Sequence, residues 1–215
     1  CHPDHAGAMS QARPELMCLG VDAQESIAAL IEACDVIAIG PGLGTDAWAA
    51  NLWQQVMAAD KPRVVDADAL NRLAREPAEN DNWILTPHPG EAGRLLDWPT
   101  PDVLDHRVDA VQGLRARYGG VAVLKGAGSL IATPEELWLC TDGNPGMAVG
   151  GMGDLLTGVI AALAGQGLDL GAAASLGVYV HARAGDAAAA RAGQRGLLPC
   201  DLFAAIRGFV NPGRA

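Results

Sequence analysis

Aromatic side chains are scarce in this sequence. Phe, Trp and Tyr make up 4% of its 215 residues, although 50% of the residues are hydrophobic. The core must therefore be built from Ala, Val, Leu and Ile, and a chain of this length can bury one large core. The 27 glycines predict many tight turns between secondary-structure elements.

The sequence also lacks an excess of basic residues, paired cysteines and a membrane-spanning run. Its net charge of −10 argues against a nucleic-acid-binding surface, which needs clustered Lys and Arg. The five cysteines are scattered, with no C-x-x-C pair, which indicates reduced thiols in a cytoplasmic protein rather than disulfides or a zinc site. Because Asp154, Asp169 and His181 interrupt the most apolar region, no apolar run is long enough to cross a membrane.

The first residues carry neither an initiator methionine nor the pattern of a signal peptide. They read Cys1-His2-Pro3-Asp4-His5, without the basic region and apolar run that a signal peptide requires. We therefore expect the chain to begin within a larger polypeptide. We also expect His2 and His5 to lie in a solvated segment rather than in a metal site.

Strand and helix patterns alternate along the chain. Apolar segments predict strands at 35–39, 63–65, 83–85 and 121–124, followed by a hairpin within 130–139. Amphipathic or Ala-rich segments predict helices at 25–33, 47–59, 69–75, 103–118, within 154–193, where we expect two or three, and at 202–210. This alternation is typical of an α/β fold with a mostly parallel, doubly wound sheet. We expect residues 1–215 to form a single domain.

A glycine-rich stretch from Gly143 to Gly153 leads into an apolar segment that predicts a helix after Asp154. Glycines let a ligand approach the main chain, and the unpaired N–H groups and dipole of a helix N-terminus favour an anion. Asp154 would lie beside that anion, where a carboxylate can accept a proton from a hydroxyl group. The alternative is that Asp154 only caps the helix.

Four other unusual segments directly follow predicted strands: Gly40–Gly44, Asp66–Asn71, Thr86–Glu91 and Lys125–Ser129. Because the carboxyl ends of parallel strands meet at one edge of a sheet, we expect these segments to converge on one crevice with the glycine-rich loop. An anion site, a candidate base, a lysine and further acids suit nucleotide-dependent phosphoryl transfer. Neither the P-loop pattern nor the G-x-G-x-x-G dinucleotide fingerprint is present.

Several of these residues also have an ordinary structural interpretation. Asp66 or Asp68 can cap the helix that follows it, and Glu91 can either cap a helix or bind a metal through water. Lys125 can contact phosphate or extend from the end of its strand into solvent. The sequence leaves these alternatives open.

Taken together, the segments resemble one enzyme family. Gly-Gly-Met-Gly-Asp, ending at Asp154, resembles the anion-hole signature of ribokinase-like enzymes. The set is similar to the ADP-dependent NAD(P)H-hydrate dehydratases, which are often fused behind an NAD(P)H-hydrate epimerase domain. The similarity runs in order from about Arg13 to Pro212 and includes GPGLG at Gly40, DADALN at Asp66, TPHPGE at Thr86 and LKGAG at Leu124.

The resemblance implies a ribokinase-like, three-layer α/β/α fold and a role for each matching residue. The reaction would remove water from the S-epimer of NADH or NADPH hydrate, with ADP or ATP as co-substrate, Mg²⁺ as cofactor, and AMP and phosphate as products when ADP is used. Asp154 would be the base, and Glu91 would hold Mg²⁺ through water. Adenine nucleotide would be bound by Lys125, Gly126, Ala127, Gly128, Ser129 and Gly153. Gly150, Gly151 and Gly153 would form the anion hole. Hydrated dinucleotide would be bound by Gly44, His88 and Asp154, with Asp68 and Asn71 as further candidates.

The resemblance has further implications for assembly. It implies a homo-oligomer, a tetramer or larger, and a link to an epimerase. Family members begin this domain with a strand and a glycine-rich segment that have no counterpart here, so we expect the N-terminal portion to be lacking and one strand edge to be unpaired.

Two alternatives to a dehydratase remain at this point. One is a small-molecule kinase of the same fold, although such kinases usually carry Asn where His88 stands. The other is a nucleotide-binding module without turnover.

Overall fold

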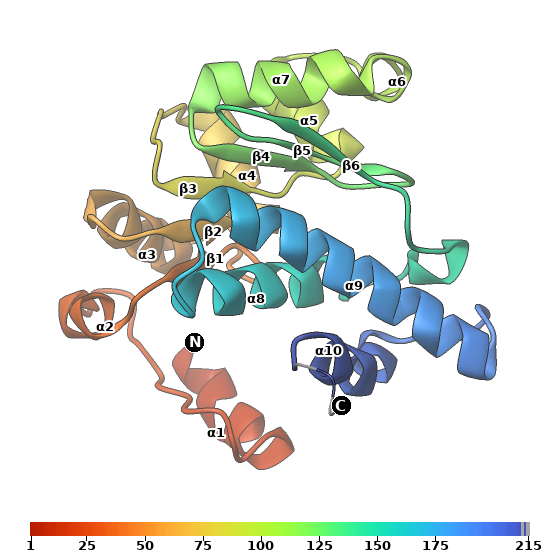
Figure 1. The fold of residues 1–215 in the computed structure, drawn as a ribbon. Coiled ribbons are helices and arrows are strands. Elements are labelled where there is room, and N and C mark those ends of the chain that lie inside the picture. Colours follow the sequence, from red (N-terminus) through yellow and green to blue (C-terminus); the bar gives the residue numbers. More distant parts are fainter. Residues whose placement is uncertain (212, 214–215) are drawn as a thin grey trace.

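A six-stranded sheet forms the centre of the computed structural model, which describes residues 1–211 and 213 (Figure 1). The spatial order is β1-β2-β3-β4-β5-β6. The strands are β1 (Ile37–Ile39), β2 (Arg63–Val65), β3 (Trp83–Leu85), β4 (Val121–Leu124), β5 (Ser129–Ala132) and β6 (Leu137–Cys140). Strands β1 to β4 pair in parallel, and the hairpin β5–β6 continues the sheet in antiparallel fashion. Pro212, Arg214 and Ala215, at the end of the predicted domain, lie outside the described residues.

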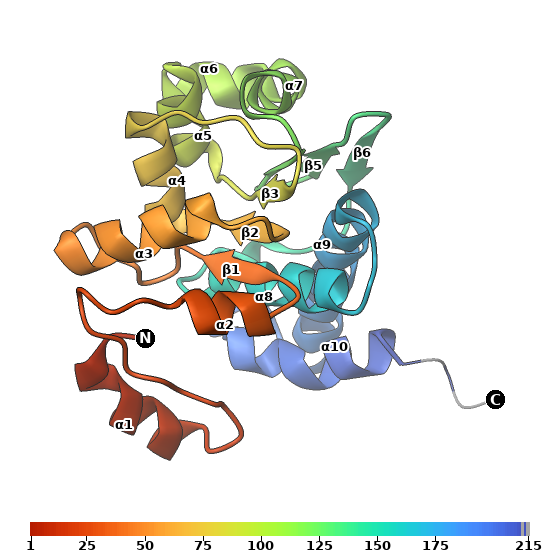
Figure 2. The same ribbon diagram turned by 90° about the vertical axis from the view of Figure 1, so that its left-hand side faces the viewer.

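Helices cover both faces of the sheet (Figures 1 and 2). One face is covered by α3 (Ala47–Ala58), α4 (Ala67–Arg75), α5 (Pro89–Leu96), α6 (Thr100–Asp105) and α7 (Arg107–Tyr118). The other is covered by α8 (Met152–Gly165) and α9 (Leu170–Ala192). The remaining elements are α1 (Pro3–Ala12), α2 (Ala28–Ala33), α10 (Phe203–Phe209) and the short 3₁₀ turns η1 (Pro145–Met147) and η2 (Pro199–Leu202). The predicted three-layer α/β/α architecture is thereby confirmed.

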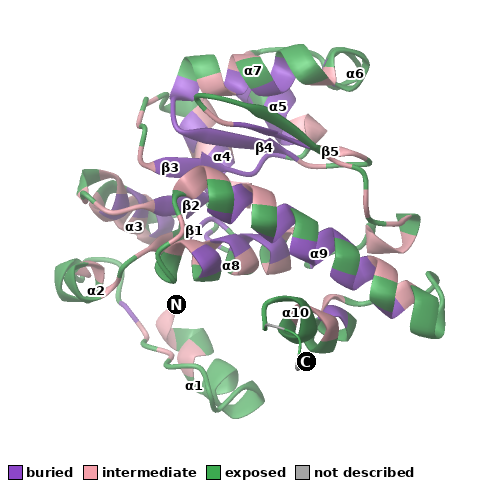
Figure 3. Ribbon diagram, viewed as in Figure 1, coloured by how far each residue is buried: buried purple, intermediate pink, exposed green. Residues whose placement is uncertain are grey.

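Alternating side chains explain how two helical layers pack on one sheet. Val65 and Leu85 belong to the apolar cluster shared with α3 to α7, whereas Val64 and Ile84 belong to the cluster shared with α8 and α9. Strands β2, β3 and β4 are buried along their whole length (Figure 3). A parallel strand covered on both faces is expected to be apolar, and β3, β4 and Val64–Val65 of β2 fit this rule. Arg63, the first residue of β2, is the exception: it is buried, and its guanidinium group donates to the carbonyl oxygens of Val56 and Ala59.

Most predicted elements are confirmed, with differences at their ends. The predicted helix over 103–118 is wrong as a single element, because His106 leaves helical geometry and separates α6 from α7. The helix predicted from residue 25 begins only at Ala28, and the helix predicted from residue 69 begins two residues earlier, at Ala67. Of the two or three helices expected after the glycine-rich loop, the structure forms two, α8 and α9.

The N-terminal segment is more ordered than the sequence suggests. It forms α1, and the Cys1 ammonium group donates a hydrogen bond to the Leu19 carbonyl oxygen over 2.9 Å. The His2 ring is half-buried, with its centroid 5.6 Å from that of Trp48, so the expectation of a fully solvated segment is wrong for His2. His5 is exposed. All five cysteines are free thiols, as predicted.

One edge of the sheet is formed by β1. Strand β1 pairs only with β2, so one edge of the described sheet ends there. Within residues 1–211 and 213, no helix combines the length and apolar character needed to span a bilayer.

Candidate active site

The segments that follow β1 to β4 lie side by side at one edge of the sheet. Backbone hydrogen bonds continue beyond the strands: Asp66 N–H donates to Ile39, Thr86 N–H donates to Val65, and Lys125 N–H donates to Pro87, over 3.0, 3.1 and 2.9 Å. These bonds place the residues after each strand next to those after its neighbour. The predicted convergence at the carboxyl edge is therefore confirmed for these segments.

A buried carboxylate joins two strands and a helix at this edge. The Lys125 ammonium group lies 2.7 Å from Asp66 Oδ1, and the Thr157 hydroxyl donates to Asp66 Oδ2 over 2.8 Å. Asp66 is only 1% exposed, so its charge must be matched within the protein. It occupies the position before α4, but its side chain makes no capping hydrogen bond, and the capping interpretation of that carboxylate is wrong.

The N-terminus of α8 faces this ion pair. A Cβ atom added at Gly153 would lie 3.2 Å from the Lys125 ammonium nitrogen, so this turn of the helix packs closely against the ion pair. The helix begins at Met152 after Gly151, whose φ of +83° is in the left-handed region. The partial positive charge of the helix terminus therefore favours an anion here, beside the Lys125 ammonium group that is paired with Asp66.

Asp154 lies in the first turn of α8 and is exposed to solvent. The helix predicted from Asp154 begins two residues earlier, at Met152, and the alternative that Asp154 is its N-cap is wrong, because Gly151 holds that position. The expectation that the last glycines lie at the helix N-terminus is confirmed. An exposed carboxylate in this turn can reach a solvent-borne ligand beside the anion position. Gly150 and Gly151 are exposed at the same terminus.

His88 and Glu91 form a capping box at the start of α5. Gly90 N–H donates to His88 Nδ1 over 3.0 Å, and His88 N–H donates to Glu91 Oε2 over 2.8 Å. The capping interpretation of Glu91 is thus confirmed. Glu91 Oε2 also lies 3.9 Å from the Lys125 ammonium nitrogen, which connects this turn to the buried ion pair. The His88 side chain remains 52% exposed and is open to a ligand.

The remaining predicted residues border the same edge. Gly44 N–H donates to Asp68 Oδ2 over 2.8 Å, which fixes the glycine loop after β1 against the start of α4. That loop borders a pocket of about 590 Å³ between β1 and α3. Asn71 accepts a hydrogen bond from Arg94 Nε over 2.8 Å and contributes an amide from the next turn of α4.

The nucleotide segment predicted at Lys125–Ser129 comprises the turn between β4 and β5 and the first residue of β5. Gly126 and Gly128 have φ angles of +140° and +70°, and the Ser129 hydroxyl donates to the Gly126 carbonyl oxygen over 3.2 Å. Gly126 and Ala127 are exposed, so their main chain is open to a ligand. In the part of the chain that the structure describes, no three His, Cys, Asp or Glu side chains gather as a metal site.

Sequence reasoning missed Thr157 and His181. Thr157 has no signal beyond its place one turn after Asp154. His181, on α9, is 7% exposed, and its Nε2 atom has no hydrogen-bond partner. Burial lowers the pKa of His181 to about 4, with a smaller lowering from the Lys125 charge and an opposing hydrogen bond with the Met152 backbone. A neutral imidazole thus lies behind the first turn of α8.

Comparisons with known proteins show which family this chain is similar to. The family model described as NAD(P)H-hydrate dehydratase matches residues 1–207. The bifunctional NAD(P)H-hydrate repair enzyme Nnr of Coxiella burnetii is 48% identical over 211 residues, which cover 98% of this chain and 43% of that protein. The Escherichia coli Nnr is 47% identical over 202 residues, covering 94% and 39%. The chain therefore spans less than half of these curated relatives.

Solved structures agree with this fold. The ADP/ATP-dependent NAD(P)H-hydrate dehydratase from Bacillus subtilis, co-crystallised with ATP/Mg²⁺ and soaked with CoA, matches with a TM-score of 0.81 and 27% identity. That match covers 96% of this chain and 77% of the other. A hypothetical protein from Streptococcus mutans matches with a TM-score of 0.85 and 28% identity, covering 97% and 76%.

The buried ion pair leads to a stability prediction. In Lys125→Met the Asp66 carboxylate loses its cation while it stays buried, so the free energy of unfolding should fall by about 3 kcal/mol. Urea denaturation measures the loss, and Asp66→Asn in the same chain should restore part of it. Arg117→Met is the control, because it breaks an exposed pair with Asp97 and should cost less than about 1 kcal/mol. Equal losses of stability in Lys125→Met and Arg117→Met would contradict a stabilising role for the buried pair of Lys125 and Asp66.

The lowered pKa of His181 leads to a prediction about acid stability. Between pH 6.5 and about 4 the unfolded chain binds a proton at this residue that the folded chain excludes. The free energy of unfolding should therefore decrease as the pH falls through this window, by up to about 3 kcal/mol from this residue. Urea denaturation at pH 7 and pH 4.5 should show a smaller acid loss for His181→Gln than for the unmodified chain. The exposed His106→Gln variant should keep the full loss, and parallel behaviour of all three chains would refute the prediction.

Proposed function

The chain belongs to the NAD(P)H-hydrate dehydratase family, and on that premise we propose that it removes water from hydrated NADH or NADPH by means of an adenine nucleotide. The observation that carries the proposal is the N-terminus of α8, where Gly153 faces the Lys125 ammonium group and Asp154 stands in the same turn. This combination pairs an anion site with an exposed base. It suits transfer of a phosphoryl group to a hydroxyl group.

The proposed reaction has two chemical steps. Asp154 accepts the proton of the substrate hydroxyl group. The oxygen atom of that hydroxyl group attacks the terminal phosphorus of ADP, so that a phosphate ester of the substrate forms and AMP leaves. Phosphate then departs with the C–O bonding electrons, the neighbouring carbon gives up a proton to water, and the electrons of that C–H bond form the ring double bond. Phosphate is a far better leaving group than hydroxide, which explains why a dehydration would consume a nucleotide.

The anion hole supports the first step. The main-chain N–H groups of Gly150, Gly151 and Gly153 would stabilise the charge that develops on the transferring phosphoryl group. The Lys125 ammonium group, which Asp66 and Glu91 hold beside Gly153, would donate a hydrogen bond to the same group. The protein would thus provide fixed hydrogen-bond donors at the place where negative charge accumulates.

The two substrates would lie on opposite sides of the transferring group. The adenine nucleotide would contact the exposed main chain of the loop Lys125–Ser129 and Gly153. The hydrated dinucleotide would lie toward Gly44 and the exposed imidazole of His88, where the pocket beside β1 offers space. Asp68 and Asn71, on the first two turns of α4, are further candidates to contact it.

Mg²⁺ fits this site as a partner of the nucleotide. Because the described residues form no metal cluster of their own, phosphate oxygens would supply most of its ligands, and Glu91 would hold it through water. The metal would neutralise part of the charge on the phosphate groups. The Bacillus subtilis relative was crystallised with ATP/Mg²⁺ and is described as ADP/ATP-dependent, which supports either nucleotide as the donor; ADP is the donor proposed here.

We also propose the wider setting that the resemblance implied. Residues 1–215 would act as one dehydratase domain in the cytoplasm, either fused to or working with an NAD(P)H-hydrate epimerase, as the bifunctional names of the relatives suggest. Exposed apolar side chains at Leu137, Trp138 and Leu139 on the edge strand β6 support assembly into a homo-oligomer.

Direct measurement of turnover tests the reaction. The chain is incubated with hydrated NADH, Mg²⁺ and either ADP, ATP or no nucleotide, while dihydronicotinamide absorbance and phosphate release are followed together. We expect absorbance to return with ADP in step with phosphate, and not to return without nucleotide. ADP binding without any return of absorbance would leave only a nucleotide-binding module. Transfer of phosphate to a small alcohol instead would indicate a kinase.

Removal of the proposed base gives a sharper prediction. Asp154→Asn should reduce turnover by about three orders of magnitude, because the substrate hydroxyl loses its proton acceptor. ADP binding, measured by calorimetry, should stay nearly unchanged. The matched control is Asp102→Asn, an exposed carboxylate in the first turn of α6, which should keep full turnover. Normal turnover in Asp154→Asn would show that Asp154 is not the base.

A further inference from the structure

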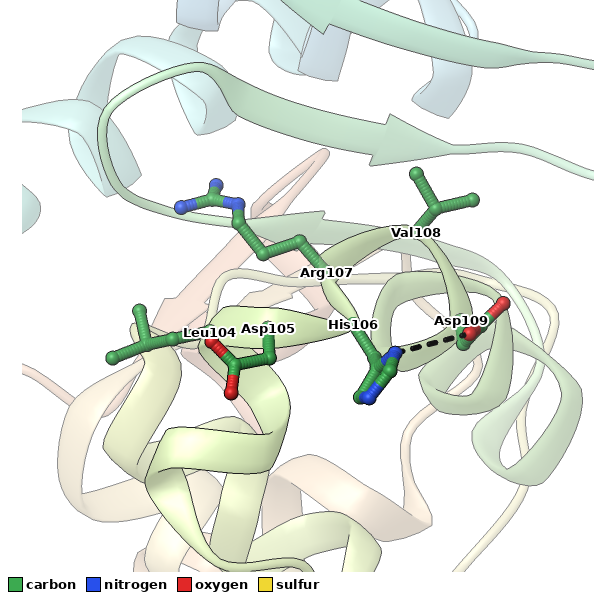
Figure 4. Close-up of a pocket in the computed structure, with 6 residues that line it drawn as sticks. All are labelled: Leu104, Asp105, His106, Arg107, Val108 and Asp109. Atoms are coloured by element: carbon green, nitrogen blue, oxygen red, sulfur yellow. Dashed lines mark ion pairs between the residues drawn. The ribbon is translucent and has the colours of Figure 1, made fainter.

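Arg107, the first residue of α7, reaches the loop that joins β4 and β5. Its Nη2 group donates hydrogen bonds to the carbonyl oxygens of Gly128 and Leu124 over 2.8 and 3.4 Å. Figure 4 shows its guanidinium group pointing away from His106 and Asp109, which pair with each other at 4.0 Å. Neither the sequence patterns nor the comparisons assign Arg107 a role.

The two acceptors lie at the two ends of this loop. Leu124 is the last residue of β4, and Gly128 directly precedes β5. One rigid guanidinium group therefore holds together the two ends of the turn Lys125–Gly128. The turn also passes close over the arginine, because a Cβ atom added at Gly126 would lie 2.7 Å from Arg107 Nη1.

The charge of Arg107 is not matched by a carboxylate. Within residues 1–211 and 213 its side chain forms no ion pair, and its recorded partners are backbone carbonyl groups. Burial lowers its pKa, yet a guanidinium group remains protonated at neutral pH. In a chain with a net charge of −10, a positive charge beneath an exposed glycine loop favours an anionic ligand on that loop.

We propose that Arg107 is a positioning residue for the nucleotide: it holds the loop Lys125–Ser129 in the shape that receives the nucleoside diphosphate. This inference rests on the nucleotide site of the proposed function. The main chain of Gly126 and Ala127 contacts the ligand, and Arg107 keeps that main chain in place from the opposite side. Lysine cannot replace it, because a single ammonium group on a flexible stem does not reproduce the planar fork.

Two variants test the proposal, Arg107→Lys and Arg107→Gln. In both, the Kd of ADP by calorimetry and the KM for ADP should rise by about tenfold, the effect of losing one charge-assisted hydrogen bond. The kcat at saturating ADP should stay close to that of the unmodified chain, because the anion hole and Asp154 remain. The amides of residues 126–129 should exchange hydrogen faster, whereas those of α8 should not.

Arg117→Lys is the matched control, since Arg117 lies on the same helix and pairs with the exposed Asp97. It should leave ADP affinity and loop exchange unchanged. Unchanged ADP affinity in both Arg107 variants overturns the proposal. So does a loss of kcat at unchanged KM, or a loss of ADP affinity that accompanies global unfolding in both.

The same measurements separate this proposal from the proposed reaction. If the unmodified chain binds ADP but restores no dihydronicotinamide, the proposed reaction is wrong, and the Kd values of the variants still test the role of Arg107. If the reaction proceeds and the variants bind ADP as tightly as the unmodified chain, only the proposal about Arg107 is wrong. If the unmodified chain binds no adenine nucleotide, both proposals fall.

Discussion

The buried carboxylate of Asp66 is the constraint on which the rest of the edge depends. A charge that is 1% exposed must be neutralised and hydrogen-bonded, and Lys125 and Thr157 do both, at 2.7 and 2.8 Å. Those two partners come from the end of β4 and the first turns of α8. Satisfying one carboxylate thus fixes where a lysine and a helix terminus stand relative to each other, which is the geometry that an anion site needs.

Glycines allow the close packing around the charged groups at this edge of the sheet. Gly40 has a φ of +131°, and a side chain there would overlap the Asp66 carbonyl oxygen. Gly153 lets α8 approach Lys125, and Gly126 lets its loop pass over Arg107. Gly40 needs a backbone without Cβ because a main-chain atom lies directly against it, whereas at Gly126 and Gly153 the close neighbour is a charged side-chain end. The glycine content therefore reflects close packing around charges as well as turning.

The sequence predicted the strands, the three layers and the edge at which the unusual segments meet, because those follow from apolar periodicity and from the geometry of parallel sheets. It could not predict that Asp66 would pair with Lys125 rather than cap α4, since the choice depends on a residue from another strand. It also placed the start of α8 two residues late, because Met152 and Gly153 look like loop residues until the packing against Lys125 is known. His181 and Arg107 were missed for the same reason: neither lies in a pattern, and each matters through what it contacts.

The span of these contacts along the chain has a consequence for how the protein folds. Lys125 lies 59 residues from Asp66 and Thr157 lies 91 residues from it, so each contact closes a long loop. Bringing such distant residues together costs loop-closure entropy, which strand pairing between them helps to offset. A partly synthesised chain ending before α8 would hold the Asp66 charge without its hydroxyl partner and would present no helix terminus to phosphate. Nucleotide affinity should therefore arise only once α8 has been synthesised and packed against the sheet, which makes ligand capture a marker of that packing step.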